Sequence, residues 1–77
     1  MFRFGVFGAI LMQITVNGEM LELDDGATVA DLVQRCEIEP KHVAIEINRA
    51  LVPRKTFADT PLNAGDQVEI VTFVGGG

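Results

Sequence analysis

MQITVNGEMLEL, residues 12–23, predicts a β-hairpin. Apolar and polar residues alternate along both arms, which is typical of strands with one buried face. Asn17-Gly18 lies between the arms, and both residues tolerate the positive φ angles of a two-residue hairpin turn. Such a turn places four apolar side chains on one face in two cross-strand pairs, so turn chemistry and hydrophobic pattern predict the same register. The pairs are Ile14 with Leu21 and Met12 with Leu23.

A helix is predicted after a loop at residues 24–27. Thr28 and Asp31 have the spacing of a capping box. Four apolar residues at positions i, i+3, i+4 and i+7 form one stripe. They are Val29, Leu32, Val33 and Cys36. Pro40 stops the helix or follows its end closely. We expect the Cys36 thiol to be buried and unreactive, because free cysteine is among the most buried residue types.

Residues 43–48 alternate as the third strand, and His42 before it is expected to be an exposed imidazole. A turn at residues 48–49 leads into a short segment at residues 51–53. We expect this segment at the edge of the sheet, because the proline that ends it cannot donate to a β-ladder. Residues 54–62 are expected to be irregular, with one helical turn near residues 56–59.

The core is expected to be closed at one end by Phe57 and Leu62, which come from that irregular segment. A tight turn at residues 64–66 precedes the last strand.

The last strand, residues 67–74, becomes apolar on both faces, where an ordinary strand would turn polar and stop. Its alternation puts Val68 and Ile70 on one face and Val71 and Phe73 on the other. Val71 and Phe73 are therefore expected to face a partner, or else to be covered by another element of this chain.

Three glycines, Gly75, Gly76 and Gly77, end the chain. They offer no side chain to pack, and ordering them carries the highest backbone entropy cost. A tail without Cβ atoms can instead enter a narrow channel and present its carboxylate, which needs activation before acyl chemistry. The chain has no phosphate-binding glycine loop with a lysine, so a partner would have to supply that step. The alternative is that the glycines form a frayed terminus or a cloning remnant.

The order strand, strand, helix, strand, short strand, final strand predicts an α+β fold. We expect a β-grasp arrangement: a mixed sheet of four to five strands, one main helix on one face, and the first and last strands side by side. Residues 12–74 would form this domain, and residues 75–77 a flexible tail. The predicted core consists of Ile14, Leu21, Leu32, Val33, Ile45, Val68 and Ile70.

Composition limits the classes of function. The 77 residues suit one small domain, and a formal net charge of −5 argues against sequence-independent binding to nucleic acid or to an anionic membrane. Cys36 is the single cysteine, so no internal disulfide can form, which suits a reducing cytoplasm. Cys36 and His42 are the only soft or imidazole ligands, so no metal site is expected.

Residues 1–11 (MFRFGVFGAIL) form an apolar extension that is too short to span a bilayer. They lack the polar linker expected after a signal peptide. Either translation starts upstream of a domain that properly begins at Met12, or the segment adds a strand or flap over apolar surface. We favour the first interpretation and expect little contribution to the core.

Several short motifs occur in a specific order and spacing over residues 12–77. They are Met12-Gln13-Ile14 with Asn17-Gly18, Thr28-Val29 with Asp31-Leu32, Ile47-Asn48 with Val52-Pro53-Arg54, Gly65-Asp66, and Phe73-Val74-Gly75-Gly76-Gly77. In this combination the chain resembles the ubiquitin-like sulfur carriers, and among them the ThiS-type carriers of thiamine biosynthesis. Residues 1–11 depart from the family pattern.

The resemblance implies a carrier and co-substrate rather than an enzyme, with no catalytic residue and no bound cofactor. An E1-like adenylyltransferase would use ATP to adenylylate the carboxylate of Gly77. A cysteine-derived persulfide would then replace AMP to leave a thiocarboxylate, whose sulfur passes to thiazole synthase. Gly75 and Gly76 would thread the partner's active site. Arg54 matches the family's Val-Pro-Arg segment, to which the resemblance assigns no role; we group it with Val71 and Phe73 as a possible partner interface.

Two alternatives share this fold. The small subunit of molybdopterin synthase carries the same thiocarboxylated tail but belongs to a stable hetero-oligomeric enzyme. A ubiquitin-like protein modifier or interaction module is the second. The Val-Pro-Arg segment, the short length after Met12 and the Phe-Val-Gly-Gly-Gly ending favour the thiamine carrier.

Overall fold

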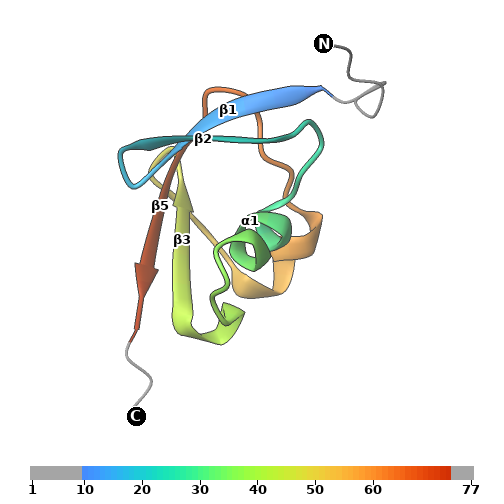
Figure 1. The fold of residues 1–77 in the computed structure, drawn as a ribbon. Helices are drawn as coiled ribbons and strands as arrows, with labels where there is room; N and C mark the ends of the chain where they lie inside the picture. The colour runs from blue at the N-terminus through green and yellow to red at the C-terminus, as the bar shows by residue number, and fades with distance from the viewer. Residues whose placement is uncertain (1–9, 74–77) are drawn as a thin grey trace.

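The computed structural model describes residues 10–73, which form one mixed sheet and its helical cover (Figure 1). The elements are β1 (Leu11–Val16), β2 (Glu19–Asp24), α1 (Val29–Arg35), η2 (Pro40–His42), β3 (Val43–Ile47), β4 (Ala50–Val52), η3 (Arg54–Asp59) and β5 (Gln67–Thr72).

The sheet has five strands in the order β2-β1-β5-β3-β4. Strand β1 pairs in parallel with β5, and the other neighbours pair antiparallel. Helix α1 packs on one face, with η3 beside it (Figure 1). The predicted β-grasp fold is therefore confirmed, including the first and last strands side by side. Strand β5 is the central strand, although it is the last in sequence.

The N-terminal hairpin has the predicted register, with Ile14 opposite Leu21 and Met12 opposite Leu23. Asn17 and Gly18 form the turn with φ angles of 50° and 86°. Of the four apolar side chains predicted to share one face, Met12, Ile14 and Leu23 are buried. Leu21, a predicted core residue, is only half-buried against the core. Strand β1 begins at Leu11, whose side chain is exposed.

Helix α1 starts as predicted and ends earlier than its apolar stripe indicates. The Asp31 N–H donates to Thr28 Oγ1, and the Thr28 N–H donates to a carboxylate oxygen of Asp31, which completes the capping box. The last helical residue is Arg35, and Glu37 then adopts a left-handed φ of 59°. Cys36 is thus the C-cap residue and is half-buried, so the expectation of a buried thiol was wrong.

The core lies between α1, η3 and one face of the sheet. Phe57 and Leu62 are buried and close its end, as predicted. The Leu62 N–H donates to the carbonyl oxygen of Ala27, which ties this segment to the loop before α1. Ile70, another predicted core residue, is half-buried and packs against the core. The buried apolar side chains are Met12, Ile14, Leu23, Ala27, Val29, Leu32, Val33, Val43, Ile45, Phe57, Leu62 and Val68.

The helices within residues 10–73 are all short, and none is long and apolar enough to cross a membrane.

Candidate functional site

The carboxyl end of β5 is where the chain leaves the sheet, on the far side of the molecule from the start of β1 (Figure 1). Thr72 is still paired with Val43, and the Phe73 N–H donates to the carbonyl oxygen of His42 at 2.7 Å. The predicted glycine site, residues 75–77, lies outside the described residues. What the structure establishes is its base, which is held in the β-ladder as far as Phe73.

Two asparagines in hairpin turns bind the backbone of β5, one at Gln67 and the other at Ile70. The side-chain amide of Asn17 accepts from the Ile70 N–H at 2.8 Å and donates to the Ile70 carbonyl oxygen at 3.2 Å. The side-chain oxygen of Asn48 accepts from the Gln67 N–H at 3.0 Å, and its amide nitrogen donates to Asp66. Sequence reasoning recognised both asparagines as turn residues and missed these contacts.

Asp66 is the one polar residue among those described that is buried, with 7% of its surface exposed. One carboxylate oxygen accepts from the side-chain amide of Asn48 and the other from the Asn63 N–H at 2.8 Å. The carboxylate is therefore hydrogen-bonded on both oxygens and braces the turn into β5.

Val71 and Phe73 lie on the sheet face opposite α1, called here the outer face. Their exposed fractions are 55% and 54%, and Val71 stands directly beside Ala44 of β3. No element within residues 10–73 covers them, so the alternative in which the described part of the chain buries them is excluded. An exposed apolar pair at the base of the tail is typical of a docking surface.

Leu51 of β4 is a further exposed apolar residue on the outer face that sequence reasoning did not single out. It lies opposite Glu46, which lies opposite Glu69 of β5. The alternation of each strand could have indicated that these residues point outward, but only the strand order places them in one row.

Arg54 is separated from Val71 and Phe73. It begins η3 and lines a groove of about 450 Å³ on the α1 side of the molecule, together with Ala30 and Gln34 of the helix. The structure therefore does not bring the three predicted interface residues onto one surface.

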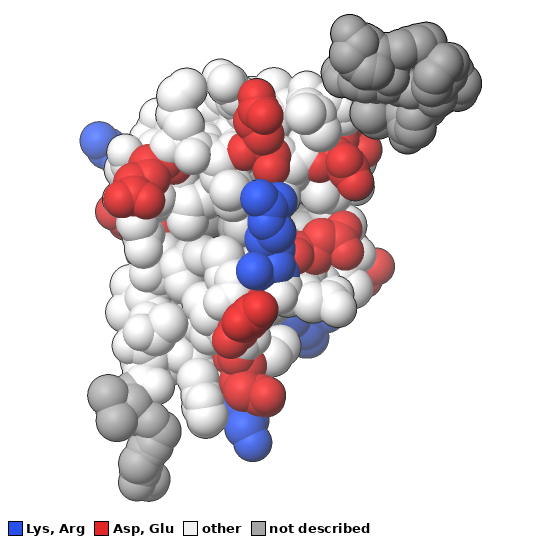
Figure 2. Space-filling view, in the orientation of Figure 1, with Lys and Arg blue, Asp and Glu red and all other residues white. Residues whose placement is uncertain are grey.

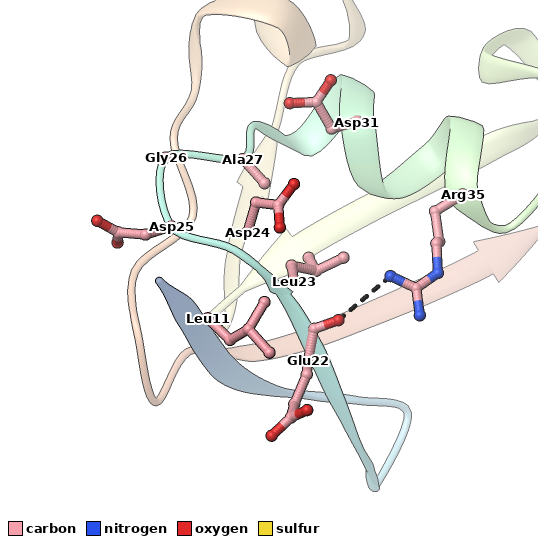
Figure 3. Close-up of a pocket in the computed structure, with 9 residues that line it drawn as sticks. All are labelled: Leu11, Glu22, Leu23, Asp24, Asp25, Gly26, Ala27, Asp31 and Arg35. Carbon is pink, nitrogen blue, oxygen red and sulfur yellow. Dashed lines mark hydrogen bonds between the residues drawn. The ribbon is translucent and has the colours of Figure 1, made fainter. Parts of the chain in front are cut away.

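A cavity of about 770 Å³ lies between β2, the following loop and α1 (Figure 3). Four carboxylates border it, but those of Glu22 and Asp25 point away from each other and that of Asp31 caps the helix. Arg35 donates to the carbonyl oxygen of Glu22 across its edge. In the described residues, no group of three or more His, Cys, Asp or Glu is placed to hold a metal ion. The cavity is thus not a convergent site.

Charge is unevenly spread over the face that carries α1. Acidic and basic side chains alternate along a band across it, whereas the part from which β5 leaves is largely uncharged in this view (Figure 2). The exposed apolar side chains of Val71 and Phe73 make the carboxyl end of β5, its outer face and the tail that follows the candidate site.

Comparison with known proteins identifies the family of the chain. Residues 7–77 match the ThiS family. The chain belongs to the ThiS family. The match begins ahead of Met12 and runs through Gly77. The sulfur carrier protein ThiS of Escherichia coli is 30% identical over 66 residues, which cover 86% of this chain and all of that protein.

The ThiS fold is found in a solved relative as well. The crystal structure of the thiamine biosynthesis protein ThiS from Geobacter metallireducens superposes with a TM-score of 0.72 at 32% identity, and the match covers 86% of this chain and all of the other. A thiazole synthase of Paramagnetospirillum magneticum is 36% identical over 66 residues. The aligned part of the chain spans only 20% of that protein's length.

Proposed function

We propose that this protein is a sulfur carrier of thiamine biosynthesis that works through the carboxylate of Gly77. The observation that carries the proposal is the ThiS match through Gly77, directly after the central strand of the sheet. Family membership supports the carrier role. The exposed end of β5 supports a tail that meets its chemistry on another protein.

The proposed chemistry starts with activation, because a carboxylate is a poor acyl electrophile. An E1-like adenylyltransferase lets the Gly77 carboxylate attack the α-phosphate of ATP, and pyrophosphate leaves. The terminal sulfur of a cysteine persulfide then attacks the acyl carbon, and AMP leaves. This attack forms a C–S bond and leaves an acyl disulfide that keeps the S–S bond of the persulfide. A thiol finally attacks the cysteine sulfur of that S–S bond and forms a disulfide with it, and the thiocarboxylate on Gly77 is the leaving group.

Thiazole synthase is the proposed acceptor of this sulfur. The support is that proteins named thiazole synthase, from Paramagnetospirillum magneticum and Magnetococcus marinus, contain a segment 36–39% identical to this chain. A carrier segment within a synthase chain would keep the sulfur donor close to the site that consumes it. On this proposal the protein is a co-substrate of the cytoplasm and performs no catalysis itself.

The geometry limits how a partner holds the tail. Gly77 is four residues after Phe73, and an extended chain spans at most about 3.6 Å per residue, so the two residues can lie at most about 14 Å apart. Gly75 and Gly76 would pass through the partner's channel. Any enzyme that acts on Gly77 must therefore approach the end of β5 closely, where Val71 and Phe73 would contact it.

The test is the intact mass of the C-terminal peptide. The purified chain is incubated with the E1-like enzyme encoded in the same genome, ATP and a persulfide donor. Replacement of one terminal oxygen by sulfur is expected, and omission of ATP should prevent it. An unchanged mass, with an enzyme that does activate another carrier, would contradict the proposal.

A further inference from the structure

Two glutamates face each other at the middle of the outer face. Glu46 of β3 lies directly opposite Glu69 of β5. Backbone hydrogen bonds join residue 42 with 73 and residue 48 with 67. In an antiparallel ladder every second pair is hydrogen-bonded, so residues 46 and 69 form such a pair between them. In such a pair the side chains leave the sheet side by side. No side-chain hydrogen bond within residues 10–73 reaches either carboxylate.

Apolar side chains border this pair on the same face. Leu51, 67% exposed, continues the row on the side of β4. Val71 and Ala44 form the next outward-facing pair toward the carboxyl end of β5. Phe73 follows Val71 by two residues, so it extends the apolar border to the base of the tail. The outer face of β4, β3 and β5 thus combines an acidic centre with an apolar rim.

Neither feature helps the isolated domain. Like charges directly opposite on neighbouring strands destabilise a sheet. Exposed apolar side chains that lie next to one another are a cost in water and mark sites of protein contact. A cation between the carboxylates would relieve their repulsion, and apolar groups over the rim would remove its side chains from water. Both contacts would therefore favour binding. A guanidinium fits best, because its planar fork can donate to two carboxylates at once.

We propose that the outer face docks on the activating enzyme, and that an arginine of that enzyme inserts between Glu46 and Glu69. This inference rests on the proposed function and names the contact that function requires. The enzyme must approach within roughly 14 Å of Phe73 to reach Gly77, and Phe73 borders the same face. Apolar side chains of the enzyme then cover Leu51 and Val71.

The experiment compares two double variants of the full chain that lose the same number of charges. Glu46→Gln with Glu69→Gln neutralises the pair, and Glu37→Gln with Glu39→Gln neutralises two exposed carboxylates in the loop after α1. Affinity for the activating enzyme, measured by calorimetry, should fall about tenfold or more for the first variant and less than twofold for the control. The melting temperature of the first variant should stay equal or rise, because repulsion within the sheet is removed. Its affinity should also depend less on salt than that of the wild-type chain.

The opposed changes in affinity and stability separate docking from a structural role. Equal weakening by both double variants would reduce the effect to net charge and overturn the proposal. So would unchanged affinity of the first variant, or a loss of affinity that follows a loss of stability. If the wild-type chain still gains its thiocarboxylate in those cases, the carrier function stands and only the docking geometry fails. If the wild-type chain neither binds the enzyme nor gains sulfur, both proposals fail.

Discussion

The side-chain amide of Asn17 takes the place of a strand residue beside Ile70. It accepts from the Ile70 N–H and donates to the Ile70 carbonyl oxygen, 53 positions away in sequence. Ladder pairing between β1 and β5 stops at Val16 and Val68, so this amide carries the pairing one step further along β5. The turn residue of the first hairpin thereby helps to hold the strand that leads to the tail.

Asn17→Gly should remove this contact while it keeps the positive φ that the turn requires. Loss of these two exposed hydrogen bonds should lower the unfolding free energy by about 1 kcal/mol. Hydrogen exchange at the Ile70 amide should speed up more than at Ile45, which lies in the adjacent ladder. Glu19→Gln, a change at an exposed residue just after the same turn, serves as the control. Unchanged exchange at Ile70 would show that Asn17 acts only as a turn residue.

Phe73→Ala should weaken the affinity for the activating enzyme several-fold and leave folding nearly intact. Its side chain is 54% exposed, so truncation removes little burial from the folded chain and much more from an interface. Met20→Ala, at an exposed residue of the edge strand β2, should change neither quantity much. A large drop in melting temperature with normal affinity of the folded fraction would make Phe73 a structural residue instead.

Deletion of Gly76 and Gly77 should abolish sulfur transfer and leave the unfolding free energy nearly unchanged. These residues have no side chain to bury, and the shortened chain no longer brings its carboxylate to the activating site. Gly76→Val should fail in the same assay, because a β-branched residue adds bulk and restricts the backbone. Mass spectrometry of the C-terminal peptide measures the transfer. A truncated chain that still gains sulfur, or supports thiazole formation, would refute the role of Gly77.

Glu37→Gly should stabilise the protein by about 0.5–1 kcal/mol. Glu37 has a φ of 59° just after the C-cap, a left-handed position that glycine adopts without steric cost. The Ile38 N–H donates to the Val33 carbonyl oxygen across this residue, so the helix end itself should not move. Chemical denaturation measures the change, with Glu39→Gly as the control. A loss of stability for Glu37→Gly equal to that of the control would show that the left-handed conformation is not strained.

Local pattern was sufficient for most of the fold. Asn17-Gly18 defined the first hairpin, the spacing of Thr28 and Asp31 defined the start of α1, and alternation located β3 and β5. Such signals depend on neighbours in sequence, so they remain readable without the tertiary structure. The end of α1 was missed because Glu37 occupies a position where glycine is the usual signal.

The outer face needed the strand order. Alternation can indicate that Glu46, Glu69 and Leu51 point outward, but nothing local predicts which strands become neighbours. The sequence also did not predict that Arg54 and Val71 lie on different sides of the molecule. Alternation within a strand does not say on which side of the sheet a separate segment such as η3 packs. Contacts between distant segments, such as Asn17 with Ile70, carry no sequence signal of their own.

The central position of β5 bears on the order of events in a transfer cycle. Edge strands such as β2 and β4 open locally at low free energy, whereas a strand paired on both sides opens only when most of the domain unfolds. Strand β5 pairs with β1 only as far as Val68, whereas its pairing with β3 continues to Thr72 and the Phe73 N–H still donates to His42. We therefore expect the base of the tail to keep one geometry whichever partner is bound. Under the proposed function, successive enzymes would meet the same rigid surface and would distinguish loaded from unloaded carrier by a single atom, the sulfur or oxygen at the end of the chain. Direction in the cycle would then come from chemical recognition of that atom rather than from a change of shape.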